Sequence, residues 1–221
     1  MKRSASVRMV LWTGITMVLI AVLLLGVGGI SLPNLGSIFS FRGFGFTSYA
    51  YENPGDYTAG GASIASSGIR EIEVNWVSGS VDIEVYDGDT IQFSESSGRV
   101  LDEDQQLYYK VKNNKLTIQY AKSKSGISFG RSPGKLLTLM IPSSLSLASL
   151  DIEGVSNNMN MAGGGISIKQ LDIETVSGSV TVEDVIAEEL DLQTVSGSAS
   201  LKGSFGIIDA EGVSGSQTYY L

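Results

Sequence analysis

Residues Leu171 to Val182 read LDIETVSGSVTV, and this stretch recurs along the chain. Four other segments align with it: IEVNWVSGSVDIEV from Ile72, LDIEGVSNNMNM from Leu150, LDLQTVSGSASL from Leu190 and IDAEGVSGSQTYYL from Ile208. The last four copies begin 21, 19 and 18 residues apart. A period near 20 residues with short apolar alternation is typical of a solenoid, whose coils bury their apolar faces against each other. The sequence therefore predicts an all-β fold, a single-stranded parallel β-solenoid (β-helix-like) of short Val-Ser-Gly-Ser coils.

The apolar alternation changes phase once inside each copy. In the copy from Leu171, inward positions alternate up to Thr175 and start again one residue early at Val176. A strand keeps a strict period of two, so this shift predicts a corner at which the chain turns while both halves still face inward. We expect the repeated glycine to point inward, where a neighbouring coil leaves little room, and its flanking serines to point outward. The residues of the repeated corner are Val77, Ser78, Gly79, Ser80, Val176, Ser177, Gly178, Ser179, Val195, Ser196, Gly197, Ser198, Val213, Ser214, Gly215 and Ser216.

The chain of 221 residues contains neither cysteine nor histidine. Thiol nucleophiles, histidine acid–base catalysis and Cys/His zinc sites are therefore excluded. A nucleophilic serine in the Ser-Gly-Ser repeats would need a lysine as its base, and a phosphate-binding loop would need Gly-Lys-Ser/Thr before a helix. Because the motif recurs at one place in every coil, we interpret it as a stacking element. We predict no enzymatic activity, no catalytic residue and no cofactor.

A column of acidic residues is predicted on the outer face of the coils. Neighbouring coils lie about 4.8 Å apart, so these carboxylates could attract divalent cations such as calcium. The calcium-binding Gly-Gly-x-Gly-x-Asp repeat is absent, so no metal site is assigned. The column comprises Asp151, Asp172, Asp191 and Asp209, with Glu153, Glu174, Gln193 and Glu211 beside it.

Residues 10–30 read VLWTGITMVLIAVLLLGVGGI and carry no charge. As a helix they would span about 31 Å, close to the hydrocarbon thickness of a bilayer. Lys2, Arg3 and Arg8 precede them, which predicts a cytoplasmic N-terminus and an extracytoplasmic remainder. We therefore predict a single-pass protein of the cell membrane, with a cleaved signal peptide as the alternative. Beyond the span, 12 basic and 23 acidic residues give a net charge of −11, which disfavours binding to nucleic acid.

Four regions are predicted along the chain. Residues 1–9 are a cytoplasmic N-terminus, residues 10–30 a transmembrane helix, residues 31–68 a stalk, and residues 69–221 the β-solenoid domain. The stalk is rich in Gly, Ser and aromatic residues, and no period of 2 or 3.6 persists in it. This composition favours an irregular spacer, with aromatic rings in the membrane headgroup region as the alternative.

The segment between the first two copies is predicted to contain two hairpins and a buried strand. The strand is Leu136–Ile141, stopped by Pro142, and the basic residues Lys122, Lys124, Arg131 and Lys135 are assigned to a mobile loop before it. The hairpins join Val81–Val85 to Thr90–Ser94 through Tyr-Asp-Gly-Asp, and Tyr108–Val111 to Leu116–Tyr120 through Asn113-Asn114.

The fifth copy stops at Tyr219-Tyr220-Leu221, inside its expected second strand. A solenoid needs a cap on its last apolar coil. We therefore expect either a truncated chain or an end that another molecule covers, including end-to-end self-association.

Taken in order, these motifs resemble the bacterial putative-adhesin family, a domain of unknown function that often follows a single membrane span. The resemblance rests on IEVNWVSGSVDI from Ile72, the Asp-Gly-Asp turn, LTLMIP from Leu137 and the repeated Leu-Asp-Ile-x-Thr-Val-Ser-Gly-Ser, and it covers roughly residues 69–221. Asn157-Asn158 departs from the pattern by replacing Gly-Ser. The resemblance implies a β-solenoid exposed at the cell surface and supplies no catalytic residues. Some members, the LiaG-type membrane proteins, accompany cell-envelope stress systems.

The leading functional hypothesis is a membrane-anchored, extracytoplasmic, non-catalytic module, adhesin-like, that binds an envelope polymer or a protein partner. The alternative is an accessory component of a cell-envelope stress-sensing system, acting through its anchor and stalk. A polysaccharide-active β-solenoid enzyme is disfavoured, because such catalysis needs two unlike carboxyl groups at one place, whereas these acids recur in every coil.

Overall fold

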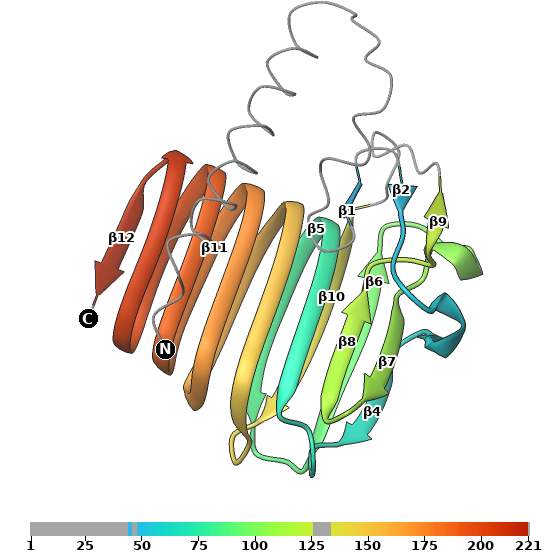
Figure 1. The fold of residues 1–221 in the computed structure, drawn as a ribbon, viewed down its shortest axis with the longest axis horizontal. Helices are drawn as coiled ribbons and strands as arrows, with labels where there is room; N and C mark the ends of the chain where they lie inside the picture. The colour runs from blue at the N-terminus through green and yellow to red at the C-terminus, as the bar shows by residue number, and fades with distance from the viewer. Residues whose placement is uncertain (1–43, 46–47, 126–133, 221) are drawn as a thin grey trace, which may run out of the picture. The chain divides into compact units, whose positions relative to one another are not determined.

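The computed structural model describes residues 44–45, 48–125 and 134–220. These residues form an all-β protein, which confirms the predicted class (Figure 1). The helical elements among them are two 3-10 helices of three residues each, η2 (Pro54–Asp56) and η3 (Glu103–Gln105). The chain divides into two compact units, the first comprising Met1–Glu52 and Ser123–Phe129, the second Asn53–Lys122 and Gly130–Leu221.

The described part of the first unit is a small antiparallel sheet. β2 (Ser48–Tyr49) lies between β1 (Phe44–Gly45) and β9 (Lys124–Ser125). Tyr49 is buried, and its ring meets the ring of Tyr51 edge to face with centroids 5.8 Å apart. The sequence predicts irregular structure for both segments that supply these strands. The pairing of β2 with β9 joins residues far apart in the chain, which local patterns do not reveal.

The second unit is organised around β5 (Glu71–Tyr86), a long strand that bends in its middle. On one side it pairs in parallel with the start of β11 (Ser146–Ser214). That ladder is continuous up to Gly154 opposite Trp76, omits Val155, and resumes at Ser156 opposite Ser78. The interruption coincides with the predicted corner. The buried apolar residues of β5 change phase across it: Ile72, Val74, Trp76, Val77, Val81 and Ile83.

Two shorter strands cover the other side of β5. β8 (Lys115–Gln119) lies parallel to its first half, and β10 (Lys135–Pro142) lies parallel to its second half. Together these strands occupy the place that one further coil would take. The neighbour of β5 on this side is therefore assembled from two separate segments of the chain.

β11 is extended over 69 residues and winds into the stacked turns seen beside β5 in Figure 1. The last strand, β12 (Gln217–Tyr220), lies parallel to residues 199–202. The arrangement of these turns is β-solenoid-like, and the apolar residues of successive copies meet inside it. The buried ones are Leu147, Leu150, Ile152, Met159, Met161, Ile166, Ile168, Leu171, Ile173, Val180, Val182, Val185, Ala187, Leu190, Leu192, Ala199 and Leu201.

The other end of the sheet is antiparallel. β6 (Thr90–Ser97) pairs with β10 and β4 (Ala62–Ala65), while β7 (Tyr108–Lys112) pairs with β8 and β3 (Thr58–Ala59). The strand order is β3-β7-β8-β5-β10-β6-β4. The sheet is therefore mixed, and a purely parallel arrangement does not describe it. β3 and β4 lie within the range predicted as stalk.

The two predicted hairpins have different outcomes. The β7–β8 hairpin is confirmed, with Lys112 opposite Lys115 and left-handed φ angles of 53° and 65° at Asn113 and Asn114. The hairpin between Val81–Val85 and Thr90–Ser94 is wrong, because β10 lies between β5 and β6 and pairs with both. β10 is a central strand with a buried apolar face, and its backbone pairs with a strand along each edge. It therefore separates β5 and β6, which are neighbours in sequence.

The predicted single-pass membrane location must be corrected. Across the described ranges 44–45, 48–125 and 134–220, no helix is long and apolar enough to cross a bilayer. Residues 10–30, to which the sequence assigns the span, lie outside the described residues.

Candidate functional site

The repeated corners lie side by side along the stack. Ser78 is opposite Ser156, and Ser80 is opposite Asn158. The structure thus brings the predicted outward residues of β5 and the next turn together, and the glycine contacts described below continue the column through the later turns. Six of its side chains are exposed and four are half-buried. The exposed ones are Ser156, Asn158, Ser196, Ser198, Ser214 and Ser216, and the half-buried ones are Ser78, Ser80, Ser177 and Ser179.

The repeated glycines set the spacing between corners. A Cβ atom on Gly178 would lie 1.8 Å from the carbonyl oxygen of Asn157, and one on Gly197 would lie 1.9 Å from that of Gly178. Real Cβ atoms do not approach a backbone oxygen so closely. Gly178 also has a φ of 124°, which disfavours any residue with a side chain. The corner at Gly178 therefore requires glycine for both space and conformation, whereas the corner at Gly197 requires it for space alone.

The corner valines are less buried than the sequence predicts. Val77 is buried, Val155, Val176 and Val195 are half-buried, and Val213 is 46% exposed. The chain turns across the Val-Ser-Gly segment itself, so the valine lies on the bend and does not point fully inward.

The serine hydroxyls of the corner bond to the neighbouring turn. Ser177 Oγ donates to the carbonyl of Val155 over 3.3 Å, and Ser179 Oγ lies 3.0 Å from Asn158 Oδ1. The backbone N–H of Ser179 donates to the same oxygen over 3.1 Å. These contacts make the corner a connected polar ladder.

Asp151 of the predicted acidic column lies opposite Glu73 of β5. Carboxylates of the column and of Glu73 have partners of their own. Lys115 forms an ion pair with Glu73, and Gln170 Nε2 donates to Asp172 over 2.8 Å. Within the described part of the chain, no group of three or more acidic side chains could hold a metal ion.

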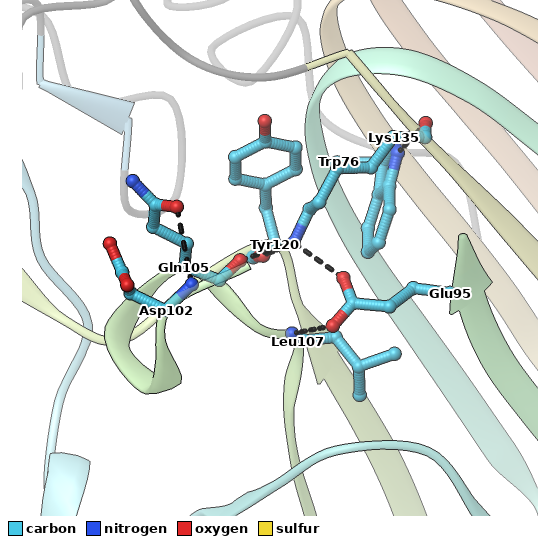
Figure 2. Close-up of polar contacts among 7 residues, drawn as sticks. All are labelled: Trp76, Glu95, Asp102, Gln105, Leu107, Tyr120 and Lys135. Carbon is cyan, nitrogen blue, oxygen red and sulfur yellow. Dashed lines mark hydrogen bonds and ion pairs between the residues drawn. The ribbon is translucent and has the colours of Figure 1, made fainter. Parts of the chain in front are cut away.

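The most concentrated polar contacts surround Lys135, the first residue of β10 (Figure 2). Its ammonium group lies 2.6 Å from Glu95 Oε2 and donates to the carbonyl of Gln105 over 2.7 Å and to that of Tyr120. It also lies 4.1 Å from the centre of the Tyr120 ring and 4.9 Å from the Trp76 ring. We refer to Lys135, Glu95, Tyr120 and Trp76 as the lysine cage.

The lysine cage ties four segments together. Glu95 on β6 accepts the backbone N–H of Leu107 over 2.7 Å, and Trp76 Nε1 donates to the backbone carbonyl of Lys135 over 3.1 Å. Gln105 belongs to η3, and the N-cap residue of this helix, Asp102, donates its N–H to Gln105 Oε1 over 3.4 Å. The cage therefore joins β5, β6, β10 and the η3 loop where the antiparallel strands meet the stacked turns.

Burial dominates the electrostatics of the cage. Burial lowers the pKa of Lys135 to about 8, although the hydrogen bond and negative charge of Glu95 partly oppose that effect. Burial, followed by the charge of Glu95, raises the pKa of Tyr120. The Lys135 side chain is 0% exposed, and its ammonium donors meet three oxygens of the protein. The arrangement is suited to holding segments together and leaves no open face for a substrate.

The lysine cage was missed in the sequence, which places Lys135 in a mobile basic loop. That assignment is wrong for Lys135, which is 1% exposed, while Arg131 lies outside the described residues. A signal was available: Lys135 has the same parity as Leu137, Leu139 and Ile141, which are all buried. Extending the period of two by one step would have placed Lys135 in the interior.

Comparisons with known proteins agree with this architecture. The family described as Toastrack DUF4097 matches residues 69–205, and no curated protein matches the chain. A "putative cell adhesion protein" from Clostridium sporogenes ATCC 15579 has a similar fold, with a TM-score of 0.50 and 11% identity over 74% of this chain and 100% of that one. A "putative adhesin" from Bacteroides fragilis NCTC 9343 gives a TM-score of 0.31 and 11% identity over 75% of this chain and 97% of that one. The family match spans more than half of the sequence, and the chain therefore belongs to the Toastrack DUF4097 family.

Proposed function

We propose that this protein is a non-catalytic, adhesin-like module that binds a polymer of the cell envelope through the polar corner of its stacked turns. The observation that carries the proposal is the pair of in-register columns of small uncharged side chains, from Ser78 and Ser80 to Ser214 and Ser216. Neighbouring turns repeat these groups about every 4.8 Å. A polymer with its own short repeat could contact several turns at once, so that many weak contacts add up.

Two further features support a binding role. The corner hydroxyls of Ser177 and Ser179 contact a carbonyl and an amide oxygen of the neighbouring turn, and neither atom is a base that could activate a serine. The fold is shared with a protein described as a putative cell adhesion protein. A rigid ladder of hydrogen-bonding groups suits recognition because little order is lost when a ligand binds.

The proposal is tested by co-sedimentation of the full chain with purified peptidoglycan and, separately, with wall polysaccharide. Ser196 and Ser198 are exposed corner residues, and we expect replacement of both by arginine to weaken binding about tenfold or more by blocking the columns. Ser167, an exposed serine of β11 outside the corners, provides the matched control, and Ser167→Arg should bind as the wild type does. Equal binding by the corner and control variants would contradict the proposal.

The non-catalytic part is tested separately. The full chain is incubated with the same polysaccharides, and released reducing ends are measured. We expect none above a buffer blank. If the amount of released reducing ends grows with protein concentration, the protein hydrolyses these polysaccharides and the non-catalytic proposal is wrong.

A further inference from the structure

Two positions recur at each corner: the residue just before the corner, and the residue at the place of the repeated glycine. In three turns the first position carries a side chain and the second is glycine. The turn from Leu150 reverses this order, with Gly154 first and Asn157 second. The pairs are Trp76 with Gly79, Gly154 with Asn157, Thr175 with Gly178, Thr194 with Gly197, and Gly212 with Gly215.

The reversed turn shows that the two positions compete for the same space. A Cβ atom on Gly154 would lie 2.2 Å from Asn157 Nδ2 and 2.4 Å from Oδ1. The Asn157 side chain therefore occupies the volume that a threonine fills in the next two turns. In the last pair both positions are glycine, and a Cβ atom on Gly212 would lie 2.7 Å from Gln217 Nε2.

Asn157 contacts a different neighbour on each side. It is 3% exposed, and its Nδ2 donates to the backbone carbonyl of Trp76 over 2.9 Å. On the other side, Thr175 Oγ1 lies 3.3 Å from Asn157 Oδ1 and 3.2 Å from the carbonyl oxygen of Ser177, so these two acceptors share its one hydrogen. The amide thus links the bend of β5 to the third turn through hydrogen bonds that are closed to water.

We propose that the side chain filling each corner fixes the order in which the turns stack. The copies are so alike that a shift by one turn would bury nearly the same apolar residues. Such a shift would separate the Asn157 amide from the Trp76 carbonyl and from Thr175, whereas the native order keeps both contacts inside the corner. A single buried polar residue that selects one register among similar ones acts in the same way in coiled coils.

The space-sharing part is tested with three variants of the full chain. Asn157→Gly empties the corner, and Gly154→Thr alone forces a side chain into the Asn157 amide, so each should lower Tm by about 5 °C or more. The double variant recreates the Thr-Val-Ser-Gly corner of the next turn and should recover most of this loss. A double variant that melts at or below the lower of the two single variants would overturn the proposal.

The order of the turns is tested by disulfide cross-linking between introduced cysteines. The chain has no cysteine of its own, so no native thiol can take part in the cross-link. In the native order Asn158 lies opposite Ser80, and Ser179 lies one turn further away, beyond the reach of a disulfide. A Ser80→Cys/Ser179→Cys cross-link therefore forms only if the third turn takes the place of the second. We expect no such cross-link with Asn157 present and a measurable fraction in the Gly154→Thr/Asn157→Gly background. The same yield in both backgrounds would show that Asn157 does not set the order.

Discussion

At the residue scale, the lysine cage contains a buried ion pair whose partners depend on each other. Lys135→Met removes the ammonium group and leaves the Glu95 carboxylate, whose side chain is 9% exposed, without its ion-pair partner. We expect a loss of about 3–5 kcal/mol in the free energy of unfolding, because an unpaired buried charge is strongly unfavourable. Adding Glu95→Gln should restore much of the loss, since a neutral amide can still accept the Leu107 N–H. Chemical denaturation of both variants measures the difference, and a double variant no more stable than Lys135→Met would contradict the pairing.

The lysine cage also makes the free energy of unfolding depend on pH, and the direction of this dependence follows from the lowered pKa of Lys135. Burial lowers the pKa of Lys135 from 10.5 to about 8, so between these values the unfolded chain binds more protons than the folded chain. The contribution of Lys135 to the free energy of unfolding therefore rises with pH in this window. The raised pKa of Tyr120 acts in the opposite sense above pH 10.0, its ordinary value.

Urea unfolding at about pH 7 and pH 9.5 isolates the Lys135 effect, because Tyr120 remains protonated in both states over most of this range. The stability of the wild type relative to the Lys135→Met/Glu95→Gln variant should increase between the two pH values. If the difference stays constant or decreases, the ammonium group does not titrate as its burial implies.

At the element scale, the β7–β8 hairpin depends on a turn that the sequence identifies correctly. Asn113 is exposed and has a left-handed φ of 53°, a conformation that β-branched residues disfavour. Asn113→Val should lower the free energy of unfolding by about 1–2 kcal/mol, whereas Asn113→Gly should leave it unchanged or raise it slightly. Equal stability of the two variants, measured by urea unfolding, would show that the turn does not control the hairpin.

Other elements could not be predicted because their partners are distant in the sequence. Tyr86 and Thr90 resemble the ends of a tight hairpin, but the Tyr86 hydroxyl donates to the Thr90 carbonyl over 2.6 Å inside a wider turn. The strands on either side are then far enough apart for β10 to lie between them. At the antiparallel end of the sheet, β10 lies between two strands that are neighbours in sequence. The stacked turns, in contrast, come from copies of one motif that follow one another along the chain.

At the scale of the whole molecule, the repeat predicts the stack better than it predicts the site. The inward glycines and the phase shift at Val77 and Val155 follow from parity alone, and the structure places a corner there. The lysine cage brings together Glu95, Tyr120 and Lys135, which lie far apart in the sequence and belong to no common motif. Its members become neighbours only when β8 and β10 jointly replace one turn beside β5.

The Val-Ser-Gly-Ser corners form one regular column, and the distance between spin labels at its two ends measures that regularity. Cysteines introduced at Ser78 and Ser214 give the chain its only thiols, and four turn-to-turn steps separate the two sites. Steps of about 4.8 Å place their backbones about 19 Å apart. Pulsed electron paramagnetic resonance of the doubly labelled full chain should give one narrow distribution at that distance, extended only by the label linkers. A broad distribution, or one centred well beyond this value, would contradict the stacked column.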